Sequence, residues 1–155
     1  MVKTVAEVMT PDPIMVGPQT SIREVIKIIA EQRISGLPVV DNAGKLVGII
    51  SETDLLWQEA GVEPPVYIMF LDSVIYLENP ARYDHELHKA LGQTVEEVMS
   101  GHPVSVKPDL SLRKAAKLMQ EKSIRRVAVT GDGGKVIGIL SSGDIVRAMA
   151  AELEE

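Results

Sequence analysis

The 155-residue chain contains no cysteine and very few aromatic residues. The absence of cysteine excludes disulfides, thiolate metal ligands and thiol nucleophiles, and it is compatible with a reducing compartment such as the cytoplasm. Only one Phe, one Trp and three Tyr are present. The chain therefore has little aromatic surface for stacking nucleic-acid bases, and its core must be built from aliphatic residues and methionine.

Positive charge and long apolar runs are scarce as well. The formal net charge is -6, which disfavours attraction to phosphate backbones, so we expect no nucleic-acid partner. The longest apolar stretch, Val66 to Leu77, spans 12 residues and contains Asp72 and Ser73. A membrane helix needs about 20 apolar residues, and the N-terminus lacks the apolar run of a signal peptide, so we expect no membrane association.

Two short motifs organise what is present. Gly48–Asp54 and Gly138–Asp144 lie 90 positions apart, and each reads as a buried strand that ends where a helix begins. Ser51 and Ser141 are predicted N-caps. Most Ser-x-x-Asp matches only satisfy a helix end, but the hydroxyl, the acid and the unpaired backbone N–H groups also form a corner that suits ribose hydroxyls or a phosphate.

The motifs belong to a larger duplication. Thr4–Leu56 aligns with Thr94–Val146 without a gap, and 20 of the 53 pairs are identical, whereas unrelated segments would share about three. Two units of this size are each marginal alone, so we expect their sheets to pack together. The sequence predicts an α+β fold with one repeat in residues 1–58, an insertion in 59–93 and a second repeat in 94–155.

Each repeat reads as β-α-β-β-α. In the first repeat we predict a short helical turn at Thr4–Met9 and a helix that begins after Ser21 and ends near Gln32. The apolar positions of this helix predict a single buried face. The remaining elements are a strand at Ile14–Val16, strands at Leu37–Val40 and Leu46–Ile50 and a helix at Glu52–Gln58, while the helix face comprises Ile22, Val25, Ile26, Ile29 and Ala30. Met9, Met15, Met99 and Met119 are predicted core residues.

The insertion has no counterpart after the second repeat. Val66–Leu77 is predicted to be helical, and a charged helix is predicted from Ala81 to Leu91. Its apolar content predicts packing across the module or a subunit contact. His85 and His88 have helical spacing, which two ligands of a metal site would share, but without a third ligand the pattern favours surface histidines.

The combined motifs resemble the cystathionine-β-synthase (CBS) domain. The resemblance rests on Val8-Met9-Thr10 with Pro13, on Ser21-Ile22 with Glu24, on Ile34–Asp41 and on Gly48–Asp54. The second half matches through Val98–Ser100, Ile124–Val129 and Gly138–Asp144. Together they resemble a tandem CBS pair, or Bateman module, over nearly all of the chain outside residues 57–93.

The resemblance implies two domains with pseudo-two-fold symmetry that pack sheet to sheet and leave two clefts for adenosine compounds. These ligands would be AMP, ADP, ATP or S-adenosylmethionine, acting as regulators and not as catalytic cofactors. Each cleft would join residues of one repeat to the Ser-x-x-Asp of the other. One cleft would comprise Thr10, Met15, Ile34, Ser35, Gly36, Ser141 and Asp144, and the other Ser100, Ser105, Ile124, Arg125, Ser51 and Asp54.

Arg125 and Arg126 are the best candidates for contacting a phosphate, because a guanidinium matches phosphate oxygens. They occupy the positions of Ser35 and Gly36 in the first repeat, which predicts clefts of unequal affinity. The alternative is that these arginines pair with nearby surface acids.

These patterns favour a regulatory binding module, which as a homodimer would signal to an effector protein in trans. The alternative is a ligand-free interaction module that uses Val66–Leu77 for assembly or docking. No phosphate-binding glycine loop and no nucleophile with its base is recognisable, so the sequence does not support an enzyme.

Overall fold

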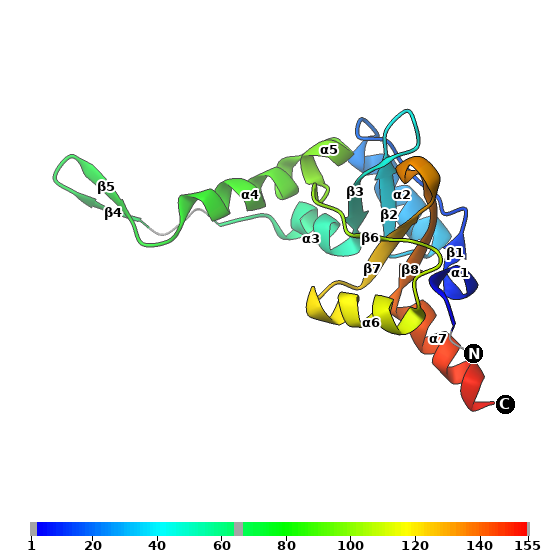
Figure 1. The fold of residues 1–155 in the computed structure, drawn as a ribbon. Coiled ribbons are helices and arrows are strands. Elements are labelled where there is room, and N and C mark those ends of the chain that lie inside the picture. Colours follow the sequence, from blue (N-terminus) through cyan, green and yellow to red (C-terminus); the bar gives the residue numbers. More distant parts are fainter. Residues whose placement is uncertain (1–2, 64–66, 155) are drawn as a thin grey trace.

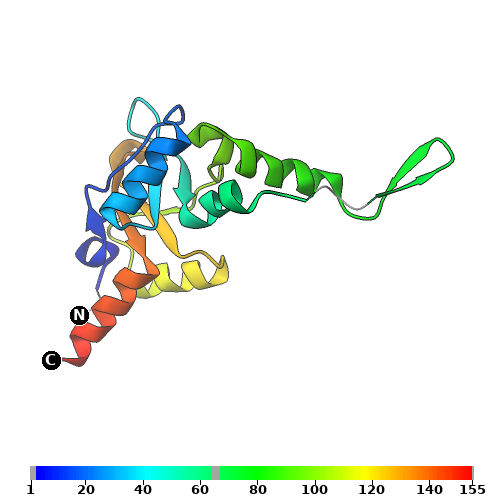
Figure 2. The ribbon, with the colours of Figure 1, turned by 180° about the vertical axis from the view of Figure 1, so that it is seen from behind.

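The computed structural model describes residues 3–63 and 67–154. It confirms the predicted α+β fold, with two similar repeats side by side and an insertion that projects from one side of them (Figures 1 and 2). No helix in the described part of the chain is long and apolar enough to cross a membrane.

The two repeats share their main elements in the same order, namely a short helical turn, a longer helix, two paired strands and a final helix, but their short first strands lie at non-equivalent positions. The first contains α1 (Val5–Val8), β1 (Thr10–Pro11), α2 (Ile22–Gln32), β2 (Gly36–Val40), β3 (Leu46–Ser51) and α3 (Glu52–Ala60). The second contains α5 (Val95–Val98), β6 (Ser105–Val106), α6 (Leu112–Glu121), β7 (Arg126–Thr130), the 3-10 helix η1 (Asp132–Gly134), β8 (Val136–Ser141) and α7 (Ser142–Leu153). The predicted strand at Ile14–Val16 is reduced to one bridge between Val16 and Val39.

The start of each repeat pairs with the sheet of the other repeat. Strand β1 lies antiparallel to β8, with Thr10 opposite Ile139, and extends the sheet to the order β1-β8-β7-β6. The equivalent residue 90 positions on, Ser100, forms an antiparallel bridge with Ile49 of β3. Residues from one repeat are thereby held beside the final strand of the other.

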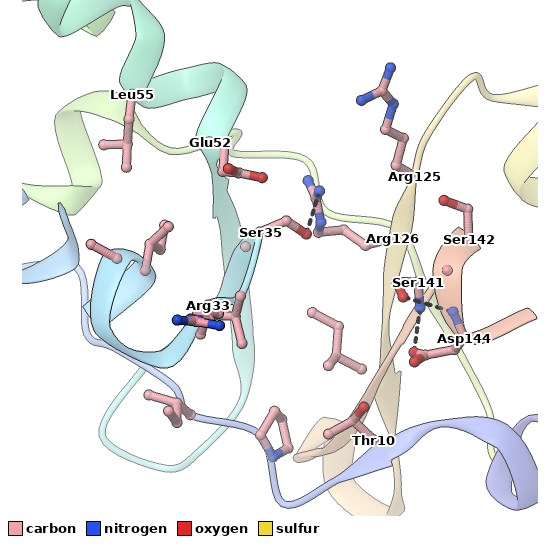
Figure 3. Close-up of a pocket in the computed structure, with 18 of the residues that line it drawn as sticks. Thr10, Arg33, Ser35, Glu52, Leu55, Arg125, Arg126, Ser141, Ser142 and Asp144 are labelled. Carbon is pink, nitrogen blue, oxygen red and sulfur yellow. Dashed lines mark hydrogen bonds between the residues drawn. The ribbon is translucent and has the colours of Figure 1, made fainter. Parts of the chain in front are cut away.

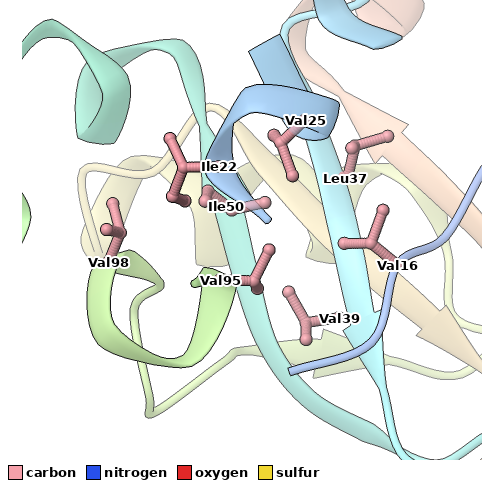
Figure 4. Packing of buried hydrophobic residues seen from close by; sticks show 8 residues of the cluster. All are labelled: Val16, Ile22, Val25, Leu37, Val39, Ile50, Val95 and Val98. Carbon is pink, nitrogen blue, oxygen red and sulfur yellow. The ribbon is translucent and has the colours of Figure 1, made fainter. Parts of the chain in front are cut away.

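The two hydrophobic cores show the same exchange. Val95 and Val98 of α5 are fully buried among residues of the first repeat, including Ile22, Val25 and Ile50 (Figure 4). Val5 of α1 is fully buried in the second core, beside Val127 and other residues of that repeat. Each repeat therefore completes the core of its neighbour.

Helix α2 does not bury the single face that its sequence predicts. Ser21 caps it by accepting a hydrogen bond from the backbone N–H of Glu24 at 3.2 Å, and Ile22 and Val25 are buried as predicted. Ile26, however, is 43% exposed. The prediction is wrong there because the helix lies between the core and an open cleft. Ile22 and Val25 face the core, whereas Ile26 lines the cleft.

The insertion is a hairpin followed by a helix. Strands β4 (Tyr67–Phe70) and β5 (Ser73–Tyr76) pair antiparallel, so the prediction of a helix over Val66–Leu77 is wrong, although Val66 lies outside the described residues. Aromatic and β-branched residues favour strands, and Leu71 takes a positive φ of 54° at the turn. The predicted charged helix is confirmed as α4 (Pro80–Leu91), which Asn79 caps.

Candidate functional site

A cleft of about 1130 Å³ lies between the repeats (Figure 3). This volume is slightly above the range of roughly 300–1,000 Å³ that is typical of ligand pockets. One wall is formed by α2 and by α3 along its length, and the opposite wall by β1, β7, β8 and the start of α7. Six of the seven residues predicted for one cleft line it together: Thr10, Ile34, Ser35, Gly36, Ser141 and Asp144.

The exchange of strands explains how these residues meet. Thr10 reaches the second repeat because β1 pairs with β8, two residues before Ser141. Ile34, Ser35 and Gly36 lie where α2 turns into β2, on the opposite wall. Met15 is not among the lining residues and is 39% exposed, so it is also not the core residue that the sequence predicts.

Ser141 and Asp144 form a complete capping box at the point where β8 ends. The Ser141 backbone N–H donates to Asp144 Oδ2 at 2.9 Å, and the Asp144 N–H donates to Ser141 Oγ at 3.1 Å. Asp144 Oδ1 accepts from Arg147 Nη2 at 2.7 Å, and this arginine side chain is 74% exposed. The carboxylate is thus held at the edge of the cleft, with a solvent-exposed arginine as its remaining partner.

Arg126 crosses the cleft from β7 to the other repeat. It lies opposite Ser141 in the β7–β8 register, and its Nη2 donates to Ser35 Oγ at 2.9 Å. Its side chain packs against Gly36, where a Cβ would lie 2.7 Å from Arg126 Cδ. Burial lowers the pKa of Arg126, and the charge of Glu52 partly offsets this effect.

Arg125 lines the same cleft and not the one predicted for it. Its side chain extends away from Ser141 in Figure 3. Among the ion pairs of the described residues, none involves Arg125 or Arg126, so the alternative of a surface ion pair is not what the structure shows. Neither guanidinium group is paired with a carboxylate in the described part of the chain, although that of Arg126 is held by Ser35.

The corner at Ser51 and Asp54 is built differently. The Ser51 N–H and Oγ donate to Asp54 Oδ2 at 3.0 and 3.2 Å. Lys89 of α4 donates to Asp54 Oδ1 at 2.6 Å and to the Val98 carbonyl at 2.8 Å. Both side chains of this ion pair are only 11% exposed. The Asp144 side chain is buried to the same extent, at 12% exposed, so the two corners differ in the partner of the acid: Lys89 is buried, whereas Arg147 is exposed. Of the two acids, only Asp144 lines the cleft.

The other residues predicted for the second cleft are not gathered around Asp54 in an open pocket. Ser100 bridges Ile49 through its backbone, and Ser105 belongs to β6 and pairs with Ala128. Ile124 packs against the second core. None of these residues, nor Ser51 or Asp54, lines the large cleft.

Sequence reasoning missed several residues of the cleft. Arg33 and Arg147 add cations, Glu52 adds an acid, and Ile26, Ile29 and Leu55 add apolar surface. The apolar periodicity of α2 identified two of these residues but assigned them to the core. Lys89 had no signal, because nothing in the sequence of a charged helix shows which of its charged side chains turns inward.

The histidines of the insertion do not form part of a recognisable metal site. His85 and His88 are exposed, and His88 Nδ1 lies 2.8 Å from the Asp84 carbonyl oxygen. Within residues 3–63 and 67–154, no group of three His, Cys, Asp or Glu side chains is placed to hold a metal ion.

The cleft as a whole combines an apolar wall, an acceptor corner and several arginines. An ionised carboxylate accepts hydrogen bonds from hydroxyl groups, and arginines bind anions. This arrangement suits a molecule with a flat apolar part, neighbouring hydroxyls and a negatively charged group.

Comparisons with known proteins identify the repeats. The chain is 33% identical over 144 residues to an uncharacterized protein of Methanocaldococcus jannaschii, and the match covers 88% of this chain and 86% of the relative. It is 36% identical to the CBS domain-containing protein CBSX1 of Arabidopsis thaliana, over 95% of this chain but only 64% of the longer relative.

Solved structures show the same architecture. CBSX2 in complex with AMP is similar with a TM-score of 0.80 and 32% identity, covering 96% of this chain and 97% of that one. The CBS domain pair of protein MJ0100, in complex with 5'-methylthioadenosine and S-adenosyl-L-methionine, has a TM-score of 0.76 and 26% identity, covering 98% and 99%. The model of the CBS domain matches residues 5–60 and 95–151. The chain therefore belongs to the CBS domain family, as a tandem pair of CBS domains.

Proposed function

We propose that this protein is a regulatory module that binds an adenosine compound in the cleft beside Asp144. The observation that carries the proposal is the meeting of Thr10, Ser35, Ser141 and Asp144 from both repeats around one cleft that also contains Arg126. The complexes of CBSX2 with AMP and of the MJ0100 pair with S-adenosyl-L-methionine support this class of ligand.

Each part of the ligand has a matching partner. The apolar side chains Ile26 and Ile29 offer a surface for the purine. The carboxylate of Asp144 accepts from the ribose hydroxyls and exchanges its exposed partner Arg147 for them. Arg125 and Arg126 face the phosphate or, for S-adenosylmethionine, the carboxylate.

A ligand in this position touches both repeats and acts on their relative placement. It biases that placement by its differential affinity for the available arrangements. A homodimer partner or an effector protein would read the change. We propose a binding role and not a catalytic one, because the cleft holds no recognisable nucleophile with its base.

The direct test is titration calorimetry with AMP, ADP, ATP and S-adenosylmethionine, on the parent and on Asp144→Asn. Hydrogen bonds to a charged group contribute about 1.5–3 kcal/mol, so this substitution should weaken binding at least tenfold. Asp132→Asn, on the exposed 3-10 helix away from the cleft, is the control. Equal affinity of parent and Asp144→Asn would refute the site, and the absence of binding by every compound would refute the function.

A second candidate function is assembly through the hairpin of β4 and β5. Met69, Phe70 and Leu71 are 64%, 63% and 86% exposed, and the hairpin projects far from the repeats (Figure 2). A two-stranded hairpin is marginally stable alone, and apolar side chains on both of its faces suit a second copy of the same hairpin. Deletion of residues 67–77 should then reduce the number of chains per particle, as calculated from the mass measured by light scattering. An unchanged number of chains, whether one or several, would contradict this candidate.

A further inference from the structure

We infer that Lys89 is a built-in occupant of the second serine and acid corner, so that the protein binds one adenosine ligand per chain, beside Asp144 and not beside Asp54. The stoichiometry rests on the proposed function. The closure of the Asp54 corner stands on the contacts of Lys89 alone.

Both oxygens of the Asp54 carboxylate already accept hydrogen bonds, and the charge is neutralised by a buried lysine. Its Oδ2 accepts two hydrogen bonds from Ser51, and its Oδ1 accepts from Lys89 Nζ at 2.6 Å. The residue is 8% exposed. A ribose would have to displace the ammonium group and leave it buried without its counter-charge, which is strongly unfavourable.

The backbone of Lys89 is held in place by contact with another helix, in addition to the ion pair of its side chain. Gln58 of α3 donates from Nε2 to the Lys89 carbonyl and, at 3.2 Å, to the Gly92 carbonyl. The neighbouring Ala90 is 7% exposed. The ammonium group also donates to the Val98 carbonyl of α5 at 2.8 Å. The end of α4 is thus fastened to both neighbouring helices, and the lysine cannot swing away like a surface side chain.

The corner at Asp144 lacks such an occupant. Its partner Arg147 lies three residues later on the same helix and has an exposed side chain. Exposed ion pairs contribute little stability, so a ligand displaces this arginine at small cost. The residue 90 positions before Arg147 is Trp57, and the insertion that carries Lys89 has no second copy. The closure therefore arises from the one segment that the duplication does not repeat.

The first experiment counts binding sites by titration calorimetry with AMP on the full chain. We expect one AMP per chain, loss of this event in Asp144→Asn, and unchanged affinity in the double variant Asp54→Asn with Lys89→Met. The double variant removes both charges together and avoids an unpaired buried one. Two AMP molecules per parent chain, or loss of binding in a folded double variant, would overturn the inference.

The second experiment needs no nucleotide affinity. Reductive methylation of the parent, followed by mass spectrometry, should modify Lys89 at least about tenfold more slowly than the exposed Lys27, because a closed group reacts only through local opening. Saturating AMP should leave the Lys89 rate unchanged. Labelling of Lys89 as fast as Lys27, or acceleration by AMP, would show an open or displaceable corner. If no adenosine compound binds, the proposed function fails, while slow labelling still supports closure.

Discussion

Gly36 and Arg126 show how one missing side chain shapes the cleft. They occupy equivalent positions of the two repeats, 90 residues apart, yet one is glycine and the other is arginine. The arginine lies across the cleft against the glycine and reaches Ser35. Two arginines in this position would repel each other across the pseudo-two-fold axis, whereas glycine leaves room for one. The difference between the two repeats at these positions is therefore one of size as well as of charge, because the small glycine makes room for the arginine.

Gly36→Ala should weaken ligand binding while leaving the fold intact. The added Cβ would lie 2.7 Å from Cδ and 2.9 Å from Nε of Arg126, so the flexible side chain has to move and loses its place beside Ser35. We expect a clear loss of AMP affinity in titration calorimetry, with a change in unfolding free energy of about 1 kcal/mol or less. Gly101→Ala, where a Cβ meets nothing within 4 Å, is the control. Undiminished affinity in Gly36→Ala would show that Arg126 does not contact the ligand.

At the scale of elements, the short helices α1 and α5 are placed in the opposite repeat. Each has four residues, too few to be stable alone, so tertiary packing maintains them. Val5 joins the core around Val127, and Val95 joins the core around Ile50. Sequence periodicity finds these turns, but it does not show in which core they are buried.

Val5→Ala should therefore loosen the second repeat and not its own. Loss of two buried methyl groups costs roughly 2 kcal/mol, and local openings report where the loss is felt. Amide hydrogen exchange of Val127 and Val129 in β7 should accelerate more than that of Leu37 and Val39 in β2. Val95→Ala is the matched variant and should give the reverse pattern. If Val5→Ala accelerated amide hydrogen exchange more in β2 than in β7, this would contradict the placement of α1 in the core of the second repeat.

For the whole molecule, the exchange makes the two repeats one folding unit. The first core lacks two fully buried valines without α5, and the second lacks Val5 without α1. The crossed strand pairings Thr10 with Ile139 and Ile49 with Ser100 connect them further. The ligand cleft lies on this junction, so its geometry depends on both repeats being folded.

A fragment of residues 1–60 should therefore be unfolded by itself. It contains every strand and helix of the first repeat but lacks Val95 and Val98, and a chain of this size has little stability to lose. Far-ultraviolet circular dichroism should show no cooperative melting for the fragment and one transition for the full chain. Cooperative melting of the fragment would mean that the repeat folds without its neighbour's helix.

Much of this protein follows from its sequence because the relevant signals are local. The capped helix after Ser21 and the strand and helix junctions at Ser51 and Ser141 depend on residues a few positions apart. The duplication is visible because the same local patterns recur 90 positions later. The same local reasoning failed for the hairpin at Tyr67–Tyr76, since a short apolar run suits either a helix or a strand.

Tertiary structure alone decided which of two equivalent motifs remains open. The two motifs have the same local sequence pattern, Ser51 with Asp54 and Ser141 with Asp144. Both form a serine and acid corner at the start of a helix. Lys89 reaches Asp54 from 35 residues away because the insertion folds back onto α3, while Asp144 retains only an exposed arginine of its own helix. Local sequence placed the two carboxylates, and long-range packing determined their access to a ligand. The sequence does not predict this packing, because a contact between distant residues produces no periodic pattern.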